Sequence, residues 1–368
     1  MKGKNILIVG GGTGGHISPG IAIYEEFVKR GVHAFVLVGR RDARFSSLAD
    51  VKDADLLLYG APSLTKNPVM LPIVALKFLH AYFWAKRFIA RSQIAAVIGM
   101  GGYVSGPALL AAARMGVPVY LCEQNSVPGK VTRYFAKRAA AIFTTFAASD
   151  EYLKNGVKIV QAGNPIRQRV FAPISCEDAR RAFNLGHCKR VILLIGGSQG
   201  ALRLNELMLG LKTKFSGEFA DTGVIWSTGD LSYNEYREKS GRALEKGSVY
   251  MSPFIENVGA AYRASDIAIS RAGSGVMMEI AAMGLPSVMI PYPFAAANHQ
   301  DKNADEFVEA GAAVKIANDD ATPEIAGPII LDLLGNPMRL AKMAEKALKV
   351  ARPDAAKTIV DEIITALR

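Results

Sequence analysis

Short apolar runs alternate along the chain with longer segments in which apolar residues recur at helical spacing. Asn5–Val9 is the first such run, a glycine-rich loop follows it, and a helix is predicted over residues 18–29. Further strands are predicted at residues 33–38, 56–59, 94–98 and 117–122. This alternation predicts a parallel β-sheet whose strands are joined by crossover helices.

The same plan begins again after Arg167. Arg190–Ile195 is predicted to be a strand, Gly196–Gly200 a loop and Ala201–Leu211 a helix. More strands are predicted at residues 223–226, 248–251, 266–270 and 287–291. The repeat of the plan predicts two open parallel sheets in tandem, each able to bind a ligand beyond the carboxyl ends of its strands.

The length of the chain agrees with two domains. Its 368 residues are half apolar and 21% charged, which suffices for two cores and excludes a disordered protein. We therefore predict an α/β fold with two Rossmann-like domains, residues 1–167 and 168–350, that face an interdomain cleft. A last helix within residues 351–368 could pack on either domain, including back onto the first.

The spacing of the cysteines and the hydropathy of the chain bear on whether it is a disulfide-rich, zinc-binding or membrane-spanning protein. Cys122, Cys176 and Cys188 have no CxxC or metal-ligand spacing, so neither a disulfide scaffold nor a zinc site is expected. The most apolar long segment, residues 69–90, is interrupted by basic side chains and is not expected to span a membrane. The N-terminus is too short for a signal-peptide core. These features are typical of a soluble, cytoplasmic-type protein.

The positive charge is concentrated in the first half of the chain. The net charge of +11 divides into +12 for residues 1–167 and −1 for residues 168–368. Between Asp55 and Glu123 there are lysines and arginines but no acidic residue. In residues 69–91 these cations interleave with apolar and aromatic side chains, which predicts an interfacial helix on an anionic membrane surface. An ordinary core helix with a basic solvent-exposed face is the alternative.

Four glycine-rich loops each follow a predicted strand: Gly10–Gly15, Gly99–Pro107, Gly196–Gly200 and Arg271–Gly275. Bare backbone N–H groups at the start of a helix bind anions such as phosphates. One such loop is usually only a tight turn, but four of them predict at least two phosphorylated ligands.

The first loop also satisfies the GxGxxG pattern of dinucleotide-binding proteins. The next strand ends in Gly39–Asp42, where Arg40 and Arg41 stand in place of the carboxylate that an NAD site requires. An NADP-dependent oxidoreductase therefore remains an alternative. In the last loop, the amides of Ser274 and Gly275 are predicted to hold a diphosphate, and Glu279 is predicted to accept from sugar hydroxyls. Alternatively, Glu279 only complements the helix dipole.

Several motifs together resemble one known family over nearly the whole chain. They are Gly11–Gly20, Gly99–Pro107, Glu123–Asn125, Gly163–Arg167, Gly196–Ala201, Pro253–Ile255, Arg271–Glu279 and His299–Asn303. The family is that of the bacterial undecaprenyldiphospho-muramoylpentapeptide N-acetylglucosaminyltransferases. The resemblance implies the two-domain GT-B fold, a hexosyltransferase activity and a role in peptidoglycan synthesis.

The implied reaction transfers N-acetylglucosamine from UDP-N-acetylglucosamine to the 4-hydroxyl of the muramoyl sugar of lipid I. The anomeric carbon is inverted and the product is lipid II. The resemblance places the donor mainly on the C-terminal domain and the acceptor, with its undecaprenyl diphosphate carrier, on the N-terminal one. It implies no cofactor, no nucleic-acid partner and a peripheral location on the cytoplasmic face of the inner membrane. Another GT-B transferase with a different acceptor is the alternative.

The resemblance also assigns substrate-binding residues. Donor phosphate and sugar would be contacted by Thr13, Gly14, Gly15, Asn125, Arg167 and Ser198. Ile255 would hold the uracil through its backbone, and Gln300 would reach the sugar hydroxyls. The diphosphate and ribose site would comprise Ser274, Gly275, Val276, Met277, Met278 and Glu279. The acceptor diphosphate would meet Gly101, Gly102 and Tyr103. Cys122 departs from the family, which usually has histidine there, and is expected to be a packed strand residue.

An inverting transfer needs a base for the attacking hydroxyl. His16 and Glu123 are the two candidates, and the sequence leaves the choice between them open. An unperturbed imidazole titrates at about pH 6.5, which suits a base near neutral pH. The only DxD motif, Asp53–Asp55, is interpreted as ordinary surface, so metal-independent transfer is expected.

Overall fold

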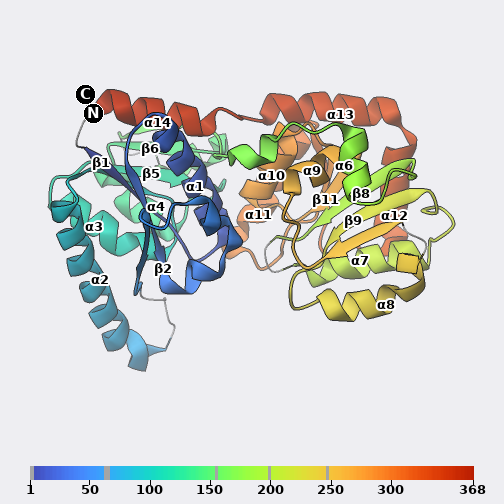
Figure 1. The fold of residues 1–368 in the computed structure, drawn as a ribbon, viewed down its shortest axis with the longest axis horizontal. Helices are drawn as coiled ribbons and strands as arrows, with labels where there is room; N and C mark the ends of the chain where they lie inside the picture. Colours follow the sequence, from blue (N-terminus) through green and yellow to red (C-terminus); the bar gives the residue numbers. More distant parts are fainter. Residues whose placement is uncertain (1–3, 62–66, 154–155, 198–199, 246–247) are drawn as a thin grey trace. The chain divides into compact units, whose positions relative to one another are not determined.

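The computed structural model describes residues 4–61, 67–153, 156–197, 200–245 and 248–368. The chain divides into two compact units (Figure 1). Unit 1 comprises residues 1–167 together with 353–368, and unit 2 comprises residues 168–352. Each unit is an open parallel sheet covered by helices, so the predicted α/β class with two parallel-sheet domains is confirmed.

Unit 1 has a seven-stranded sheet in the order β3-β2-β1-β4-β5-β6-β7. The strands are β1 Asn5–Val9, β2 Ala34–Gly39, β3 Leu56–Tyr59, β4 Ile94–Gly99, β5 Val119–Glu123, β6 Ala141–Thr144 and β7 Lys158–Gln161. The helices are α1 Gly14–Lys29, α2 Leu71–Arg91, α3 Gly106–Arg114, α4 Lys130–Phe135, α5 Asp150–Leu153 and α14 Ala355–Ala366. Short 3₁₀ turns are η1 Arg40–Arg44, η2 Ser46–Asp50, η3 Pro68–Met70, η4 Tyr103–Ser105, η5 Ala136–Arg138 and η6 Ala147–Ser149.

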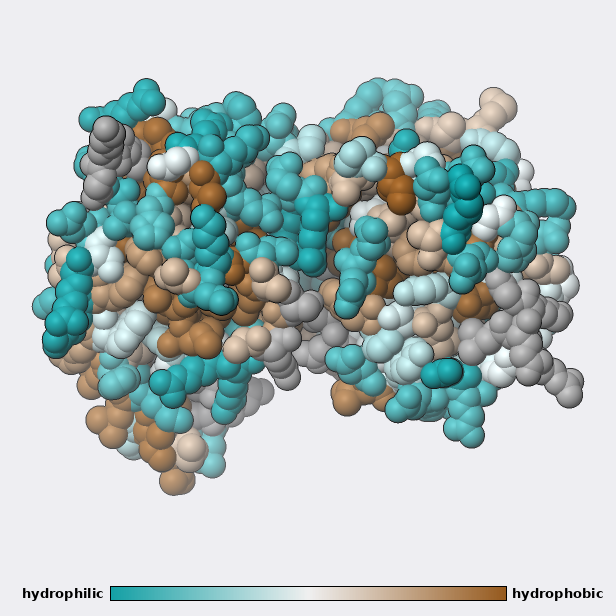
Figure 2. All heavy atoms as spheres, viewed as in Figure 1, coloured by the Kyte–Doolittle hydropathy of each residue, from teal (hydrophilic) through white to brown (hydrophobic). Residues whose placement is uncertain are grey.

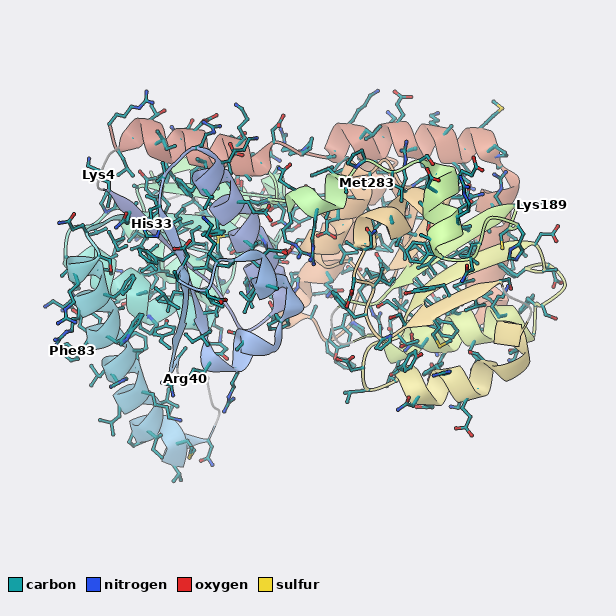
Figure 3. The ribbon with its side chains drawn as sticks, viewed as in Figure 1. Lys4, His33, Arg40, Phe83, Lys189 and Met283 are labelled. Atoms are coloured by element: carbon teal, nitrogen blue, oxygen red, sulfur yellow. The ribbon has the colours of Figure 1, made fainter. Side chains whose placement is uncertain are left out.

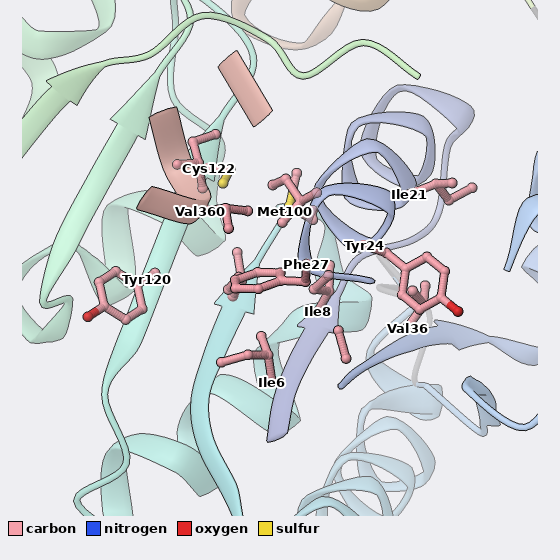
Figure 4. Packing of buried hydrophobic residues seen from close by; sticks show 14 of the residues in the cluster. Ile6, Ile8, Ile21, Tyr24, Phe27, Val36, Met100, Tyr120, Cys122 and Val360 are labelled. Atoms are coloured by element: carbon pink, nitrogen blue, oxygen red, sulfur yellow. The ribbon is translucent and has the colours of Figure 1, made fainter. Parts of the chain in front are cut away.

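Alternate residues of the strands supply the two cores of unit 1. Ile6 and Ile8 of β1 point to one face, where they pack with Phe27 of α1 and Val360 of α14 (Figure 4). The intervening residues of β1 point to the other face, which α2 and α3 cover. Because side chains alternate along a strand, every central strand is apolar on both faces, and this explains its continuous apolar sequence.

The C-terminal helix α14 packs on α1 within unit 1. Arg30 Nη1 donates to Asp361 Oδ1 over 2.7 Å, and Lys4 Nζ donates to the Leu367 carbonyl over 3.0 Å. The end of the chain is therefore part of the first sheet's helical layer.

Unit 2 has a six-stranded sheet in the order β10-β9-β8-β11-β12-β13. The strands are β8 Arg190–Ile195, β9 Thr222–Ser227, β10 Val249–Ser252, β11 Ile267–Ser270, β12 Ser287–Met289 and β13 Ala313–Lys315. The helices are α6 Cys176–Ala182, α7 Leu202–Thr213, α8 Tyr233–Glu245, α9 Val258–Ala264, α10 Ser274–Ala282, α11 His299–Glu309, α12 Pro323–Gly335 and α13 Pro337–Val350. The 3₁₀ turns are η7 Gln168–Phe171 and η8 Ala296–Asn298.

The interpretation of the DxD motif as ordinary surface is wrong for Asp55. The Asp55 side chain is buried at the start of β3, where it accepts from Tyr24 Oη at 2.6 Å and pairs with His33 Nε2 at 2.8 Å. Burial by itself would raise the pKa of Asp55, but these two hydrogen bonds outweigh it and lower the pKa below its ordinary value. Burial and the same hydrogen bond raise the pKa of Tyr24 to about 12.

Candidate active site

The first glycine loop joins β1 to α1 and is held from the side by a carboxylate. Asp42 in η1 accepts from the backbone N–H of Gly12 and of Gly39, each over 3.1 Å. A Cβ at Gly11 would lie 2.4 Å from Asp42 Oδ2, so only glycine fits there. The amide of Gly12 is thus already used within the protein, and a negative charge lies beside the loop. Nothing in the sequence pointed to this contact, because Asp42 lies in η1, just beyond the end of β2.

The amides that remain for a ligand belong to the start of α1. Gly14 and Gly15 are the first two residues of this helix, and no preceding turn can accept from their N–H groups. Thr13 precedes them with extended backbone geometry. The predicted residues Thr13, Gly14 and Gly15 therefore form one continuous segment at the carboxyl end of β1.

His16 lies between the first and second glycine loops. Its Nδ1 is 3.1 Å from Thr13 Oγ1. A Cβ at Gly101 would lie 3.1 Å from His16 Nε2, and one at Gly102 would lie 2.5 Å from the Gly11 carbonyl oxygen. Both glycines have positive φ, 92° and 74°. The close approach of the second loop to His16 and to the first loop therefore requires glycine at both positions.

Glu123 ends β5 and is buried, with its carboxylate directed at its own loop. Its Oε1 accepts from the Asn125 backbone N–H over 3.1 Å, and its Oε2 accepts from the Gly129 N–H over 3.0 Å. Both oxygens thus shape the segment that carries Asn125. The neighbouring Cys122 is buried as expected, and burial together with the Glu123 charge raises the pKa of its thiol.

Arg167 is the last residue of the first segment of unit 1, and its guanidinium is buried. Its Nη1 donates to Asp50 Oδ2 over 3.2 Å, while its Nε has no hydrogen-bond partner among the described residues. The guanidinium is thus held inside unit 1 by Asp50, with its Nε enclosed by the protein.

In unit 2 the predicted diphosphate site is the start of α10. Ser274 and Gly275 open the helix after the loop that follows β11. The side chains of Met277 and Met278 are buried in the core and cannot contact a ligand. The Met277 N–H already donates to the Gly273 carbonyl. Val276 is half-buried in the same first turn. In this turn the backbone N–H groups of Ser274 and Gly275 are therefore the ones that could bind an anion.

Glu279 is oriented by a buried tyrosine that the sequence analysis did not single out. Tyr262 of α9 donates from its hydroxyl to Glu279 Oε2 over 2.7 Å, and the Tyr262 side chain is 1% exposed. A carboxylate that accepts from a fixed donor keeps one orientation, so the Tyr262 hydroxyl holds the Glu279 side chain in place.

Arg271 fixes the segment that leads to Gln300. Its Nη1 donates to the carbonyls of Ile290 and Pro291 and to Asn318 Oδ1, over 2.9 to 3.1 Å. Burial lowers the pKa of this guanidinium. Gln300 of α11 in turn accepts from the Tyr292 N–H over 2.9 Å. Arg271 is thus a structural cation rather than an exposed phosphate ligand.

Two further residues, Ile255 and Ser198, were predicted to bind the sugar nucleotide. Ile255 lies beyond the end of β10 and is 4% exposed, so only its backbone could meet a ligand. Ser198 lies outside the described residues. The loop that contains it ends at Gly200, where a Cβ would lie 2.1 Å from the Thr228 carbonyl oxygen and φ is 74°. This turn therefore depends on glycine.

Comparisons with known proteins match both units. Residues 6–144 match the glycosyltransferase family 28 N-terminal domain, and residues 191–359 match the glycosyltransferase family 28 C-terminal domain. The chain is 33% identical to the UDP-N-acetylglucosamine–N-acetylmuramyl-(pentapeptide) pyrophosphoryl-undecaprenol N-acetylglucosamine transferase of Bacteroides thetaiotaomicron, over 99% of this chain and 98% of that protein. It is 34% identical to the enzyme of the same name from Chlorobium limicola, over 98% of each.

Solved structures agree with these matches. The crystal structure of Acinetobacter baumannii MurG aligns with a TM-score of 0.74 and 27% identity, over 98% of this chain and 99% of that one. The UDP-GlcNAc 2-epimerase of Neisseria meningitidis, bound to UDP-GlcNAc, aligns with a TM-score of 0.71 but only 15% identity, over 98% of this chain and 100% of that one. The second likeness concerns the fold alone.

Proposed function

The chain belongs to the family of UDP-N-acetylglucosamine–N-acetylmuramyl-(pentapeptide) pyrophosphoryl-undecaprenol N-acetylglucosamine transferases, and from this premise we propose that it converts lipid I to lipid II. It is a glycosyltransferase, and the resemblance found in the sequence is confirmed. In the proposed reaction N-acetylglucosamine passes from UDP-N-acetylglucosamine to the 4-hydroxyl of the muramoyl sugar of lipid I. The observation that carries the proposal is the identity of one-third over both domains.

The donor binds unit 2. The amides of Ser274 and Gly275 at the start of α10 receive the UDP diphosphate, and Glu279 accepts from the ribose hydroxyls. The support is the start of α10 at Ser274 and Gly275, where helix N–H groups have no preceding turn to bond, together with the Tyr262 hydroxyl that orients Glu279. Ile255 receives the uracil through its backbone, and Gln300 meets the sugar hydroxyls.

The acceptor binds unit 1. Its diphosphate lies against Gly101, Gly102 and Tyr103, and the sugar that is transferred lies near Thr13–Gly15 and Asn125. The support is the close packing of Gly101 and Gly102 against the imidazole of His16, whose Nδ1 is 3.1 Å from Thr13 Oγ1.

His16 is the general base. The acceptor hydroxyl oxygen forms a bond to the anomeric carbon while the bond from that carbon to the UDP oxygen breaks. The hydroxyl proton passes to His16 Nε2, and UDP leaves with the bonding electron pair. For Nε2 to be the acceptor, Nδ1 must carry the other proton and donate it to Thr13 Oγ1, which lies 3.1 Å away. Glu123 instead holds the Asn125 loop, because both of its oxygens already accept from backbone amides.

The departing diphosphate is stabilised by protein groups rather than by a metal ion. The start of α10 carries the partial positive charge of a helix N-terminus, which favours the negative charge that develops on the leaving group. Of the DxD pair, Asp55 is already engaged by Tyr24 and His33, so the motif does not offer two free carboxylates.

The protein associates peripherally with the anionic cytoplasmic face of the inner membrane through α2. Ala81, Ala85 and Ile89 of this helix are buried against the sheet. Leu76, Leu79 and Phe83, three and four residues apart, lie on the opposite side and are 50 to 67% exposed. Figure 2 shows the hydrophobic surface along this helix. Among the described residues no helix is long and apolar enough to cross a membrane.

The test is transfer of N-acetylglucosamine from UDP-N-acetylglucosamine to lipid I, measured by lipid II formation in the presence of EDTA. We expect the wild-type chain to be active, and His16→Gln to lower kcat by about 10²–10⁴-fold, because glutamine cannot take a proton. Glu123→Gln is the matched variant. If it abolishes kcat while His16→Gln does not, the base is Glu123. Activity that EDTA removes and Mg²⁺ restores would contradict metal-independent transfer.

A further inference from the structure

A pocket of about 480 Å³ lies in unit 1 between η1, α2 and the turn η4 within the second glycine loop. Arg40 and Arg41 form one wall, Lys77 and His80 of α2 form another, and Tyr103 forms part of a third. Its volume is in the range of small-ligand sites. Neither the donor nor the general base requires this pocket, and the arginines in it are those that the sequence singled out for an NADP phosphate.

The charge of the pocket lining is strongly positive. Arg40, Arg41 and Lys77 are exposed, and within the ranges that the structure describes no ion pair joins them to a carboxylate. The acidic member of the lining, Asp42, is buried and accepts from the amides of Gly12 and Gly39, so its charge is directed toward the glycine loops. Three cations that line one pocket and are not ion-paired with its single carboxylate favour a ligand with a compact, multiply charged anionic group.

One wall of the pocket is firmly fixed. The buried Tyr59 hydroxyl donates to the Val104 carbonyl, which ties the end of β3 to the turn that carries Tyr103. Gly39 and Gly60, at the ends of β2 and β3, also line the pocket. Arg40 and Arg41 follow the carboxyl end of β2 and line the pocket together with residues of α2, and Figure 3 shows Arg40 there.

The position of the pocket indicates where its ligand comes from. Leu76 lines the pocket and is also 67% exposed on the apolar face of α2 that includes Leu79 and Phe83. A helix that lies in a bilayer interface buries its apolar face at the boundary between headgroups and acyl chains. The cations beside Leu76 would then be at the depth of the lipid phosphates.

We propose that this pocket binds the phosphate of an anionic phospholipid headgroup, with Arg40, Arg41 and Lys77 as its ligands. The inference rests on the proposed membrane association and makes it specific, because a defined headgroup site adds to the diffuse attraction of the basic surface. A lipid bound in the pocket would fix the rotation of α2 about its own axis at the membrane. It would thereby also fix how the second glycine loop is oriented toward the membrane surface.

The test uses the full chain and a phospholipid that is monomeric in water. Binding of dihexanoyl-phosphatidylglycerol, below its micelle concentration, is measured by calorimetry for the wild type, for Arg40→Gln/Arg41→Gln and for Arg87→Gln/Arg91→Gln. The last variant removes the same charge from exposed positions of α2 that do not line the pocket. We expect Arg40→Gln/Arg41→Gln to weaken binding at least tenfold and Arg87→Gln/Arg91→Gln to change it less than twofold.

Three outcomes would overturn the proposal. Equal weakening by both variants would assign binding to the general field of charge. Equal affinity for free glycerol phosphate would show that the pocket takes a soluble phosphate rather than a lipid. A tenfold rise in KM for a water-soluble, short-chain acceptor in Arg40→Gln/Arg41→Gln, with lipid binding unchanged, would assign the pocket to the acceptor. Failure of membrane association itself is distinguishable, because wild-type protein would then not partition onto phosphatidylglycerol vesicles.

Discussion

At the scale of single residues, the hydroxyl of Tyr262 and the carboxylate of Glu279 form the contact with the clearest consequence for the donor. Tyr262→Phe removes one hydrogen bond to a charged group and leaves the ring packed. Such bonds contribute about 1.5–3 kcal/mol, so we expect the KM for UDP-N-acetylglucosamine to rise about tenfold or more with kcat nearly unchanged. Steady-state kinetics with varied donor concentration measures this.

Two variants make that result interpretable. Tyr236→Phe removes the hydroxyl of another buried tyrosine of unit 2 and should leave the donor KM unchanged. Glu279→Ala should weaken donor binding by itself and should cancel the effect of Tyr262→Phe when the two are combined, because the residues act through one hydrogen bond. A full additional effect in the double variant would refute the positioning role of Tyr262.

At the scale of elements, Asp55 joins the α1 helix, through Tyr24, to the chain just before β2, through His33. Asp55→Asn should destabilise the protein by about 1–3 kcal/mol at neutral pH, because it disrupts buried hydrogen bonds to a charged group. Asp53→Asn, two residues away and exposed, is the control and should stay within about 0.5 kcal/mol of the wild type. Denaturant unfolding measures both.

The pH dependence of this difference follows from the lowered pKa of Asp55. The carboxylate binds its proton less readily in the folded than in the unfolded chain, so its stabilising contribution is complete above the ordinary carboxyl pKa of 3.8. The contribution is lost as the pH falls through the folded-state pKa. The difference in the free energy of unfolding between wild type and Asp55→Asn should therefore become smaller in acid. A gap that is constant down to the lowest pH would contradict the assigned pairing.

The α2 helix is the element that should set membrane affinity. Replacing Leu76, Leu79 and Phe83 with glutamine should lower partitioning onto phosphatidylglycerol vesicles by tenfold or more, because each side chain would lose roughly 1 kcal/mol or more of apolar burial. A variant with glutamine at Leu231, Met338 and Leu348 removes three exposed apolar residues of unit 2 and serves as the control. Sedimentation with vesicles measures both, and equal losses would exclude α2 as the docking helix.

At the scale of the whole molecule, ligand binding should stabilise the folded chain according to which nucleotide fits. UDP-N-acetylglucosamine at a hundred times its Kd should add about 2.7 kcal/mol and raise the Tm. NADPH should not, because Asp42 already occupies the Gly12 amide and places a carboxylate where a dinucleotide pyrophosphate would lie. A thermal-shift titration decides this, and stabilisation by NADPH alone would contradict the proposed function.

The sequence by itself determined what depends on neighbours along the chain. Apolar runs and glycine-rich loops are local signals, so the central strands, the two-sheet plan and the loops at their carboxyl ends were predictable. The strands β6, β7 and β13 were not predicted. β7 and β13 lie at sheet edges and each include a lysine, which weakens their apolar signal. The first helix was predicted to begin at residue 18, and it begins at Gly14, because glycines hide a helical start.

Tertiary structure alone decided the polar contacts that shape the site. Asp42 meets Gly12 from 30 residues away, and Tyr262 meets Glu279 from a different helix. The burial of Asp55 likewise depends on Tyr24, 31 residues earlier in the chain. No periodicity encodes such pairs, because a hydrogen bond forms between groups that are close in space, and the packing of helices on a sheet sets that closeness.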